Sequence, residues 1–119
     1  LDFERVYKAG TRVHGRFMTL FLLPNGGPVA RFGVAATRKI GSAVDRNRVK
    51  RLSREVFRRK NAAVGLDVVV VPRREMLDAS FASLETDYSA TLERGGRQLS
   101  SSARTGYRRE SRARGNKGV

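Results

Sequence analysis

Two neighbouring stretches in the middle of the chain decide the fold: GSAVDRNRVKRLSREVFRRKN at residues 41–61 and LDVVVV at residues 66–71. In the first stretch, apolar residues recur on one helical face from Val49 to Val56, and cations fill the opposite face. This pattern predicts an amphipathic helix with Ser42 as its N-cap. The second stretch is apolar throughout, which is typical of a central strand. Together they predict a mixed α/β domain.

The flanking sequence completes a predicted α-β-β-α-β-α order. It favours a short helix over residues 2–10, a strand over 13–23 and a second strand over 29–37. A Pro-Asn-Gly-Gly-Pro turn joins these two strands, so we expect them to pair as a hairpin. A last helix is predicted from about residue 80 to residue 94. The second strand, the central helix and the third strand form a βαβ unit, whose crossover is right-handed in most proteins.

The composition predicts one domain and a tail. A chain of 119 residues suits a single domain. Over residues 95–119 Gly, Ser and Arg dominate, and such a segment buries too little surface to offset its ordering entropy. We therefore expect one domain over residues 1–94 and a basic disordered tail after it. The chain has no cysteine and no apolar run near membrane-spanning length, which favours a cytoplasmic protein without a membrane anchor.

The net charge of +14 is unevenly distributed. Residues 38–60 carry a net +8 and residues 95–119 a net +6, while the other 71 residues are neutral. Charge gathered in this way predicts a polyanionic partner, although a solvated basic helix face is the alternative. The sequence shows no catalytic constellation and no set of metal ligands. The one histidine, His14, has no identifiable partner.

The cations of the central helix are the first candidate contacts. Arg46, Lys50 and Arg54 follow an i, i+4, i+8 spacing and form a ridge along the helix. The planar guanidinium of an arginine can bind a phosphate through two hydrogen bonds. Asn47 suits a base edge or a 2′-OH, or else a local hydrogen bond on the helix. Arg48 could contact RNA or equally brace the helix against the sheet. The candidates on this helix are Arg46, Asn47, Arg48, Lys50, Arg51, Arg54 and Arg58.

Four aromatic residues form the second candidate group. Phe3 and Tyr7 share one face of the first helix, and Phe17 and Phe21 share one face of the first predicted strand. If exposed beside cations, each ring could stack on an unpaired base, which contributes about 1–3 kcal/mol per base. The other interpretation, an ordinary hydrophobic core, fits the same residues.

Residues 38–55, RKIGSAVDRNRVKRLSRE, resemble the signature of the bacterial ribonuclease P protein family. The likeness centres on Arg-Asn-Arg followed by Lys-Arg, with Lys-Ile-Gly-x-Ala-Val before it. An N-terminal Asp-Phe-x-x-Val-Tyr-Lys-x-Gly and the Val-Val-Val-Val-Pro strand are similar to that family too. The resemblance covers roughly residues 2–94 and departs at Ser53, where an aliphatic residue is expected.

The resemblance implies a function. The chain would be the protein subunit of ribonuclease P, which binds the catalytic RNA and the 5′ leader of precursor tRNA and assists endonucleolytic removal of that leader. The catalytic groups and the Mg²⁺ ions would belong to the RNA, with no metal on the protein, which would be a monomer within the holoenzyme. Arg38 and Lys39 would reach backbone phosphates. Phe3, Tyr7 and Phe21 would line the leader cleft, and Phe17 is a further candidate that is more typical of the core.

The resemblance also implies a fold. It is an α+β fold, a two-layer α/β sandwich like the second domain of ribosomal protein S5, with a left-handed βαβ crossover that we adopt over the right-handed default. Three rival functions remain: a structural RNA-binding protein, a DNA-binding helix protein and an autonomous nuclease. A structural RNA-binding role does not explain the Arg-Asn-Arg block. A DNA-binding helix protein would need paired helices that the sequence does not predict, and an autonomous nuclease would need clusters of acids, bases and metal ligands that it does not show.

Overall fold

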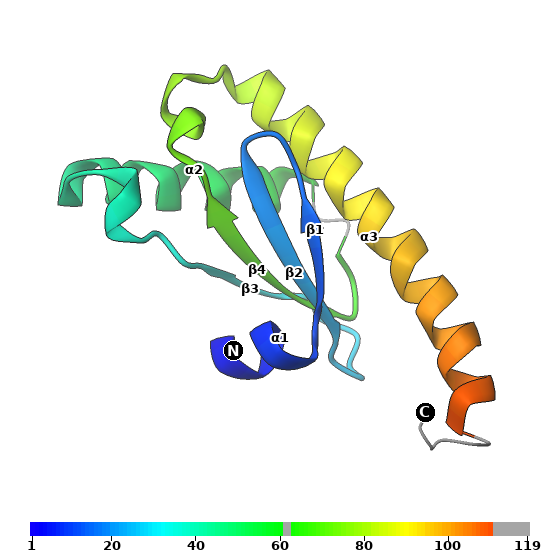
Figure 1. Cartoon of the computed structure of the whole chain (residues 1–119). Coiled ribbons are helices and arrows are strands. Elements are labelled where there is room, and N and C mark those ends of the chain that lie inside the picture. Colours follow the sequence, from blue (N-terminus) through cyan, green and yellow to red (C-terminus); the bar gives the residue numbers. More distant parts are fainter. Residues whose placement is uncertain (61–62, 111–119) are drawn as a thin grey trace.

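The computed structural model describes residues 1–60 and 63–110, with side chains through residue 100. A four-stranded sheet has the order β1-β2-β4-β3, in which β2 is antiparallel to both neighbours and β3 is parallel to β4. Figure 1 shows how the helices lie around this sheet. The elements are α1 (Phe3–Ala9), β1 (Thr11–His14), β2 (Met18–Pro24), β3 (Arg31–Val34), the 3₁₀ helix η1 (Arg38–Ile40), α2 (Ala43–Lys60), β4 (Leu66–Pro72), the 3₁₀ helix η2 (Arg74–Asp78) and α3 (Phe81–Glu110).

The two faces of the sheet differ because successive side chains of a strand point to opposite sides. On one face Leu20 and Val70 pack in the main core with α2 and α3. The other face carries Phe21 and Val69, which are register partners, and is covered in part by α1. Val6 of α1 is fully buried against this second face. We call the second face the open face. The α+β class predicted from the sequence is confirmed.

The central helix forms as predicted, with Val49 and Val56 buried. Its N-terminus is capped by Ser42, whose Oγ accepts from the Asp45 N–H at 3.2 Å, while the Ser42 N–H donates to Asp45 at 3.4 Å. Gly41 precedes the cap with φ +139°, and a Cβ there would lie 2.5 Å from the Asp45 carboxylate. Ser53 lies inside the packed face: it is 4% exposed, and its Oγ lies 3.7 Å from the Met76 sulfur.

The strand predicted over residues 13–23 is in fact two antiparallel strands, β1 and β2. The chain reverses at Gly15, whose N–H donates to the Met18 carbonyl at 2.8 Å. Asp87 of α3 holds this turn by accepting from the Arg16 N–H at 2.9 Å and the Phe17 N–H at 2.8 Å. A carboxylate distant in sequence therefore stabilises a turn whose local sequence signal is a single glycine.

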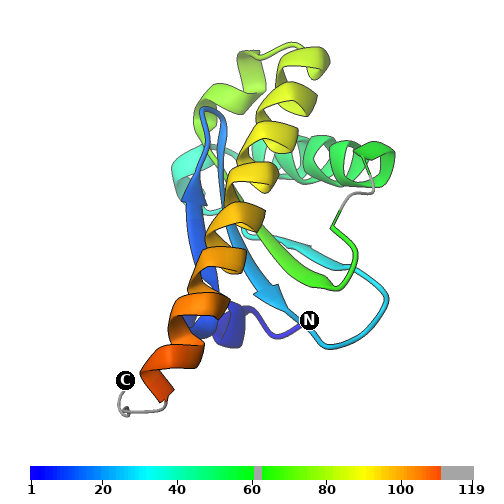
Figure 2. The ribbon, with the colours of Figure 1, turned by 90° about the vertical axis from the view of Figure 1, so that its right-hand side faces the viewer.

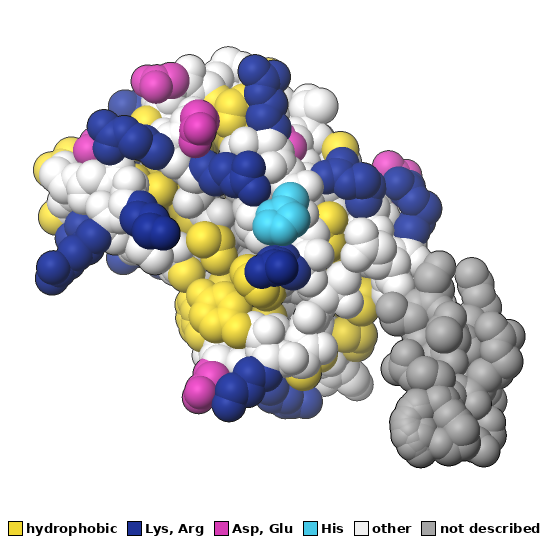
Figure 3. Space-filling view, in the orientation of Figure 1, with side chains coloured by type: hydrophobic (Ala, Val, Ile, Leu, Met, Phe, Trp, Pro, Cys, Tyr) yellow, Lys and Arg dark blue, Asp and Glu magenta, His cyan; other side chains and the backbone are white. Residues whose placement is uncertain are grey.

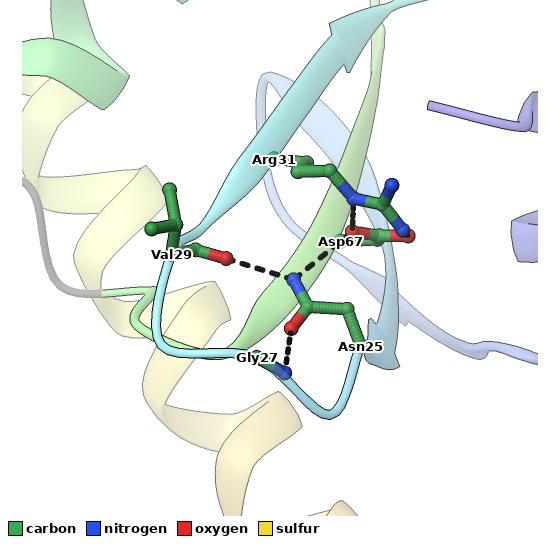
Figure 4. Close-up of polar contacts among 5 residues, drawn as sticks. All are labelled: Asn25, Gly27, Val29, Arg31 and Asp67. Carbon is green, nitrogen blue, oxygen red and sulfur yellow. Dashed lines mark hydrogen bonds and ion pairs between the residues drawn. The ribbon is translucent and has the colours of Figure 1, made fainter.

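The predicted hairpin between residues 13–23 and 29–37 is also wrong. Strand β3 pairs with β4 rather than with β2, because β4 lies between these two strands. The apolar β4 thereby has a hydrogen-bonded strand on each edge. Asn25 fixes the connection by donating to the Val29 carbonyl at 2.9 Å and to Asp67 at 3.1 Å (Figure 4). Arg31 joins β3 to β4 through two hydrogen bonds to Asp67, at 2.7 and 2.8 Å. The parallel pairing of β3 with β4 completes the βαβ unit, and its handedness stays a prediction.

The last helix is longer than predicted. It continues past Arg94 to Glu110, and its C-terminal turns extend beyond the strands in both views (Figures 1 and 2). The helix packs through residue 99, since a Cβ at Gly95 would collide with Leu22 and Leu99 contacts the core. The predicted boundary at residue 94 falls inside α3, and the part of the predicted disordered tail up to residue 110 is helical. Residues 111–119 lie outside the described residues. None of the described helices is both long and apolar enough to cross a membrane.

Candidate RNA interface

The exposed side of α2 carries most of the predicted cations. Its orientation follows from Val49 and Val56, which bury the opposite side against the sheet. Arg46 and Lys50 lie half-buried at the flank of the helix. The exposed candidates are Asn47, Arg48, Arg51, Arg54 and Arg58. Arg48 is therefore on the solvent side of the helix rather than against the sheet.

Two of these arginines have partners within the protein. Arg46 donates to the Gly41 carbonyl at 2.9 Å, so it also stabilises the turn that precedes α2. Arg58 forms an ion pair with Glu55, and its hydrogen bond lowers the pKa of that carboxyl. In the described part of the chain, no ion pair involves Arg51 or Arg54, whose charge is free for a partner.

Arg59 contributes to the fold instead. Its guanidinium lies 3.4 Å from the Glu85 carboxylate and 5.2 Å from the centre of the Phe81 ring, both on α3. The residue therefore ties α2 to α3.

Two further cations extend the charged surface before α2. Arg38 and Lys39 are exposed on η1, as the sequence predicted. The turn is fixed at one end by Thr37, whose side chain accepts from the Lys39 N–H at 3.4 Å, and at the other by the buried Ile40. We call the exposed cations of η1 and α2 together the basic strip; its members are Arg38, Lys39, Arg48, Arg51, Arg54 and Arg58.

Three of the four predicted aromatic residues meet on the open face. The ring centres of Phe3 and Tyr7 are 6.3 Å apart and those of Tyr7 and Phe21 are 4.9 Å apart, both edge to face. Tyr7 is 39% exposed, and its partial burial raises the pKa of the phenol. We call Phe3, Tyr7 and Phe21 the aromatic group. Figure 3 shows hydrophobic side chains gathered on this side of the molecule, with Lys and Arg side chains around them.

Phe17 does not belong to the aromatic group, and its inclusion in the predicted leader cleft was wrong. It lies in the turn between β1 and β2, is 9% exposed and packs in the main core. The Arg16 guanidinium covers its ring at 5.0 Å from the centre. The alternation that placed Phe17 on the same face as Phe21 fails because the turn interrupts the strand.

The sequence did not predict a polar cluster at the hairpin end of the open face. There the His14 Nδ1 lies 3.1 Å from the Thr19 Oγ1, and Arg73 donates to the same Oγ1 at 3.2 Å. Arg12, exposed and opposite Phe21 in the register, lies between this cluster and the aromatic group. Strand alternation from Phe21 to Thr19 could have identified part of it, but the approach of Arg73 depends on the pairing of β2 with β4.

The arrangement suits a single-stranded nucleic acid better than a reaction centre. Exposed aromatic rings can stack on bases, and nearby cations can neutralise phosphates. Within residues 1–60 and 63–100, no three His, Cys, Asp or Glu side chains come together as a metal site would require.

Comparison with known proteins finds relatives over most of the chain. The family model described as Ribonuclease P matches residues 1–96. The ribonuclease P protein component of Caldanaerobacter subterraneus subsp. tengcongensis is 41% identical over 95 residues, covering 78% of this chain and 82% of that protein. The component from Clostridioides difficile is 30% identical over 96 residues, covering 78% and 84%.

Solved structures show the same likeness. The RNase P protein from Thermotoga maritima matches with a TM-score of 0.72 at 31% identity, covering 78% of this chain and 90% of that one. The Staphylococcus aureus RNase P protein matches with a TM-score of 0.68 at 29% identity, covering 77% and 86%. The chain therefore belongs to the ribonuclease P protein family, which makes it a protein component of a tRNA-processing endoribonuclease.

Proposed function

We propose that the basic strip binds the RNA subunit of ribonuclease P and that the open face holds the single-stranded 5′ leader of precursor tRNA. The observation that carries this proposal is the exposure of Tyr7 beside Phe21 on a face that the main core does not use. A soluble domain gains little from a partly exposed aromatic ring there unless the ring has a partner. An unpaired base is a partner of the right shape, since each base offers a flat face for stacking.

The division of labour follows from the chemistry of the residues. The rigid α2 presents Arg51 and Arg54 at fixed spacing, so the helix can contact several phosphates of a folded RNA without reorganising. The protein thereby reduces the repulsion between two polyanions and raises the affinity of the RNA subunit for its substrate. The catalytic groups and the Mg²⁺ ions are those of the RNA. The protein acts as one copy in the holoenzyme, in the cytoplasm.

Reconstitution tests the proposal directly. The full-length protein is mixed with a bacterial ribonuclease P RNA and a precursor tRNA at a Mg²⁺ concentration at which the RNA alone is nearly inactive. We expect 5′-leader cleavage only when both subunits are present. We also expect the reconstituted holoenzyme to bind precursor tRNA more tightly than mature tRNA.

Two results would contradict the proposal in different ways. A folded protein that binds the RNA but does not restore cleavage would favour a purely structural RNA-binding role. Cleavage by the protein without RNA would favour an autonomous nuclease.

A further inference from the structure

The polar cluster at the hairpin end of the open face consists of His14, Thr19 and Arg73, and we call it the hairpin-end cluster. His14 is exposed, whereas Thr19 is 8% exposed beneath it. Besides its bond to Thr19, Arg73 approaches the His14 Nδ1 at 3.4 Å. The three side chains come from β1, β2 and the residue after β4, so the sheet itself brings them together.

The contacts of the His14 Nδ1 favour one tautomer of the neutral ring. A guanidinium can only donate, so the Nδ1 beside Arg73 acts as an acceptor. The Thr19 oxygen already accepts from Arg73, which leaves its hydroxyl hydrogen to donate to the same Nδ1. The approach of Arg73 therefore favours the neutral tautomer that carries its proton on Nε2. Among the described residues Nε2 has no hydrogen-bond partner, and the ring is at the surface, so it offers a donor to a ligand.

The position of the cluster continues the path of the aromatic group. Arg12 is opposite Phe21, and His14 is opposite Thr19, two residues further along both strands. Two residues of an antiparallel strand span about 7 Å. A single strand that stacks on Tyr7 and Phe21 and runs along β1 and β2 therefore reaches His14 after passing Arg12. Both Arg12 and Arg73 add positive charge on this path.

We propose that the hairpin-end cluster is a second nucleotide subsite on the open face, at which the His14 Nε2–H donates to a phosphodiester oxygen of the 5′ leader. Arg73 supplies charge and holds the imidazole in the donating tautomer together with Thr19. The chemistry favours a phosphate over a base edge, because two arginines flank the imidazole donor. The inference rests on the proposed function. It adds a residue that makes the affinity depend on the length of the leader rather than on its sequence.

The cluster can be tested without unfolding the domain. The His14 side chain is exposed, and the Arg94 contact to this residue goes to the backbone carbonyl, so a substitution leaves that contact in place. The amide nitrogen of glutamine lies near the position of Nε2, and that of asparagine near the position of Nδ1. His14→Gln can therefore keep the proposed donor, whereas His14→Asn and His14→Ala remove it.

The experiment measures the affinity of the reconstituted holoenzyme for precursor tRNAs whose leaders increase one nucleotide at a time. We expect His14→Ala and His14→Asn to lose about two- to tenfold in affinity once the leader is long enough to reach the cluster. Shorter leaders and mature tRNA should be unaffected, and His14→Gln should retain the wild-type affinity. Thr86→Ala, at an exposed position on α3, is the matched control.

A second arm distinguishes phosphate from base. A neutral methylphosphonate is placed at each leader position in turn. At one leader position, the methylphosphonate should weaken binding by the wild-type holoenzyme and leave binding by the His14→Ala holoenzyme unchanged. Altering the base at that position should change the affinity of neither holoenzyme. A loss that depends on the base and not on the phosphate would overturn the proposal.

The outcomes also separate this inference from the proposed function. If the wild-type holoenzyme gains no affinity from any leader, both fail. If it does gain affinity but His14→Ala behaves as wild type at every length, or loses equally at every length, only the hairpin-end subsite is overturned.

Discussion

The ring of Phe3 rests on the backbone of Gly33, at a site where a Cβ would lie 2.5 Å from the Cζ atom of that ring. This contact joins α1 to β3 and sets the height of the aromatic group above the sheet. A glycine at residue 33 is therefore needed for the aromatic group to lie at this height on the open face.

Gly33→Ala should displace Phe3 and loosen α1. Because the added methyl meets a packed ring, we expect a loss of about 1–3 kcal/mol in the free energy of unfolding, measured by urea denaturation. Precursor tRNA should bind more weakly while mature tRNA is little affected. Gly96→Ala is the control, since a Cβ there meets nothing within 4 Å. Unchanged leader affinity in Gly33→Ala would show that the position of Phe3 is unimportant for binding.

Tyr7→Ala should weaken the binding of precursor tRNA more than that of mature tRNA, by about 1–3 kcal/mol for one lost stacking partner. Filter binding with the reconstituted holoenzyme measures both affinities. Phe17→Ala is the matched aromatic control: it should destabilise the fold by about 3 kcal/mol, because Phe17 packs in the core. At a temperature where it remains folded, it should keep the preference for precursor tRNA. An equal loss for both RNAs in Tyr7→Ala would contradict its role.

Arg51→Ala should flatten the salt dependence of RNA binding by about one unit of slope for one lost phosphate contact. The slope of the logarithm of the binding constant against the logarithm of salt concentration is the measurement. Arg59→Ala removes the same charge from the same helix, but Arg59 is paired with Glu85, so we expect its slope to match that of the wild type. Identical slopes for all three proteins would remove Arg51 from the interface. Arg46→Ala should weaken RNA binding and also destabilise the turn at Gly41, because it removes the hydrogen bond to the Gly41 carbonyl.

The Arg31 hydrogen bond holds the pKa of Asp67 below its ordinary value. A carboxyl whose pKa is lower in the folded state stabilises the fold above its unfolded pKa, about 3.9, and that contribution is lost as the pH falls towards the folded value. Asp67→Asn should therefore be less stable at neutral pH and should lose less stability between about pH 5 and pH 2. Urea unfolding across this range measures both effects. Asp78→Asn, at an exposed position, should follow the wild type; a parallel curve for Asp67→Asn would contradict the assignment.

Local patterns predicted the elements whose signals lie within one segment. The helical spacing of Val49 and Val56 predicted the buried and exposed faces of α2, and Ser42 predicted its start. The uninterrupted valines identified β4 as a central strand. The same wheel placed Arg51 and Arg54 in solvent.

The errors arose where distant residues decide the structure. The turn between β1 and β2 depends on Asp87, and the pairing of β3 depends on the insertion of β4 beside it. Phe17 was assigned to the wrong surface for the first reason. His14 and Arg73 were missed as a pair because 59 residues separate them in sequence.

The two hydrogen bonds that Asp87 accepts have a consequence for synthesis of the chain. The Phe17 N–H donates to a residue 70 positions later in the chain. The hydrogen bonds of the turn between β1 and β2 therefore cannot all form until α3 has left the ribosome and docked. We therefore expect the nascent chain to remain incompletely folded through most of translation, with its basic helix already exposed to the surrounding RNA before the sheet beneath it has closed.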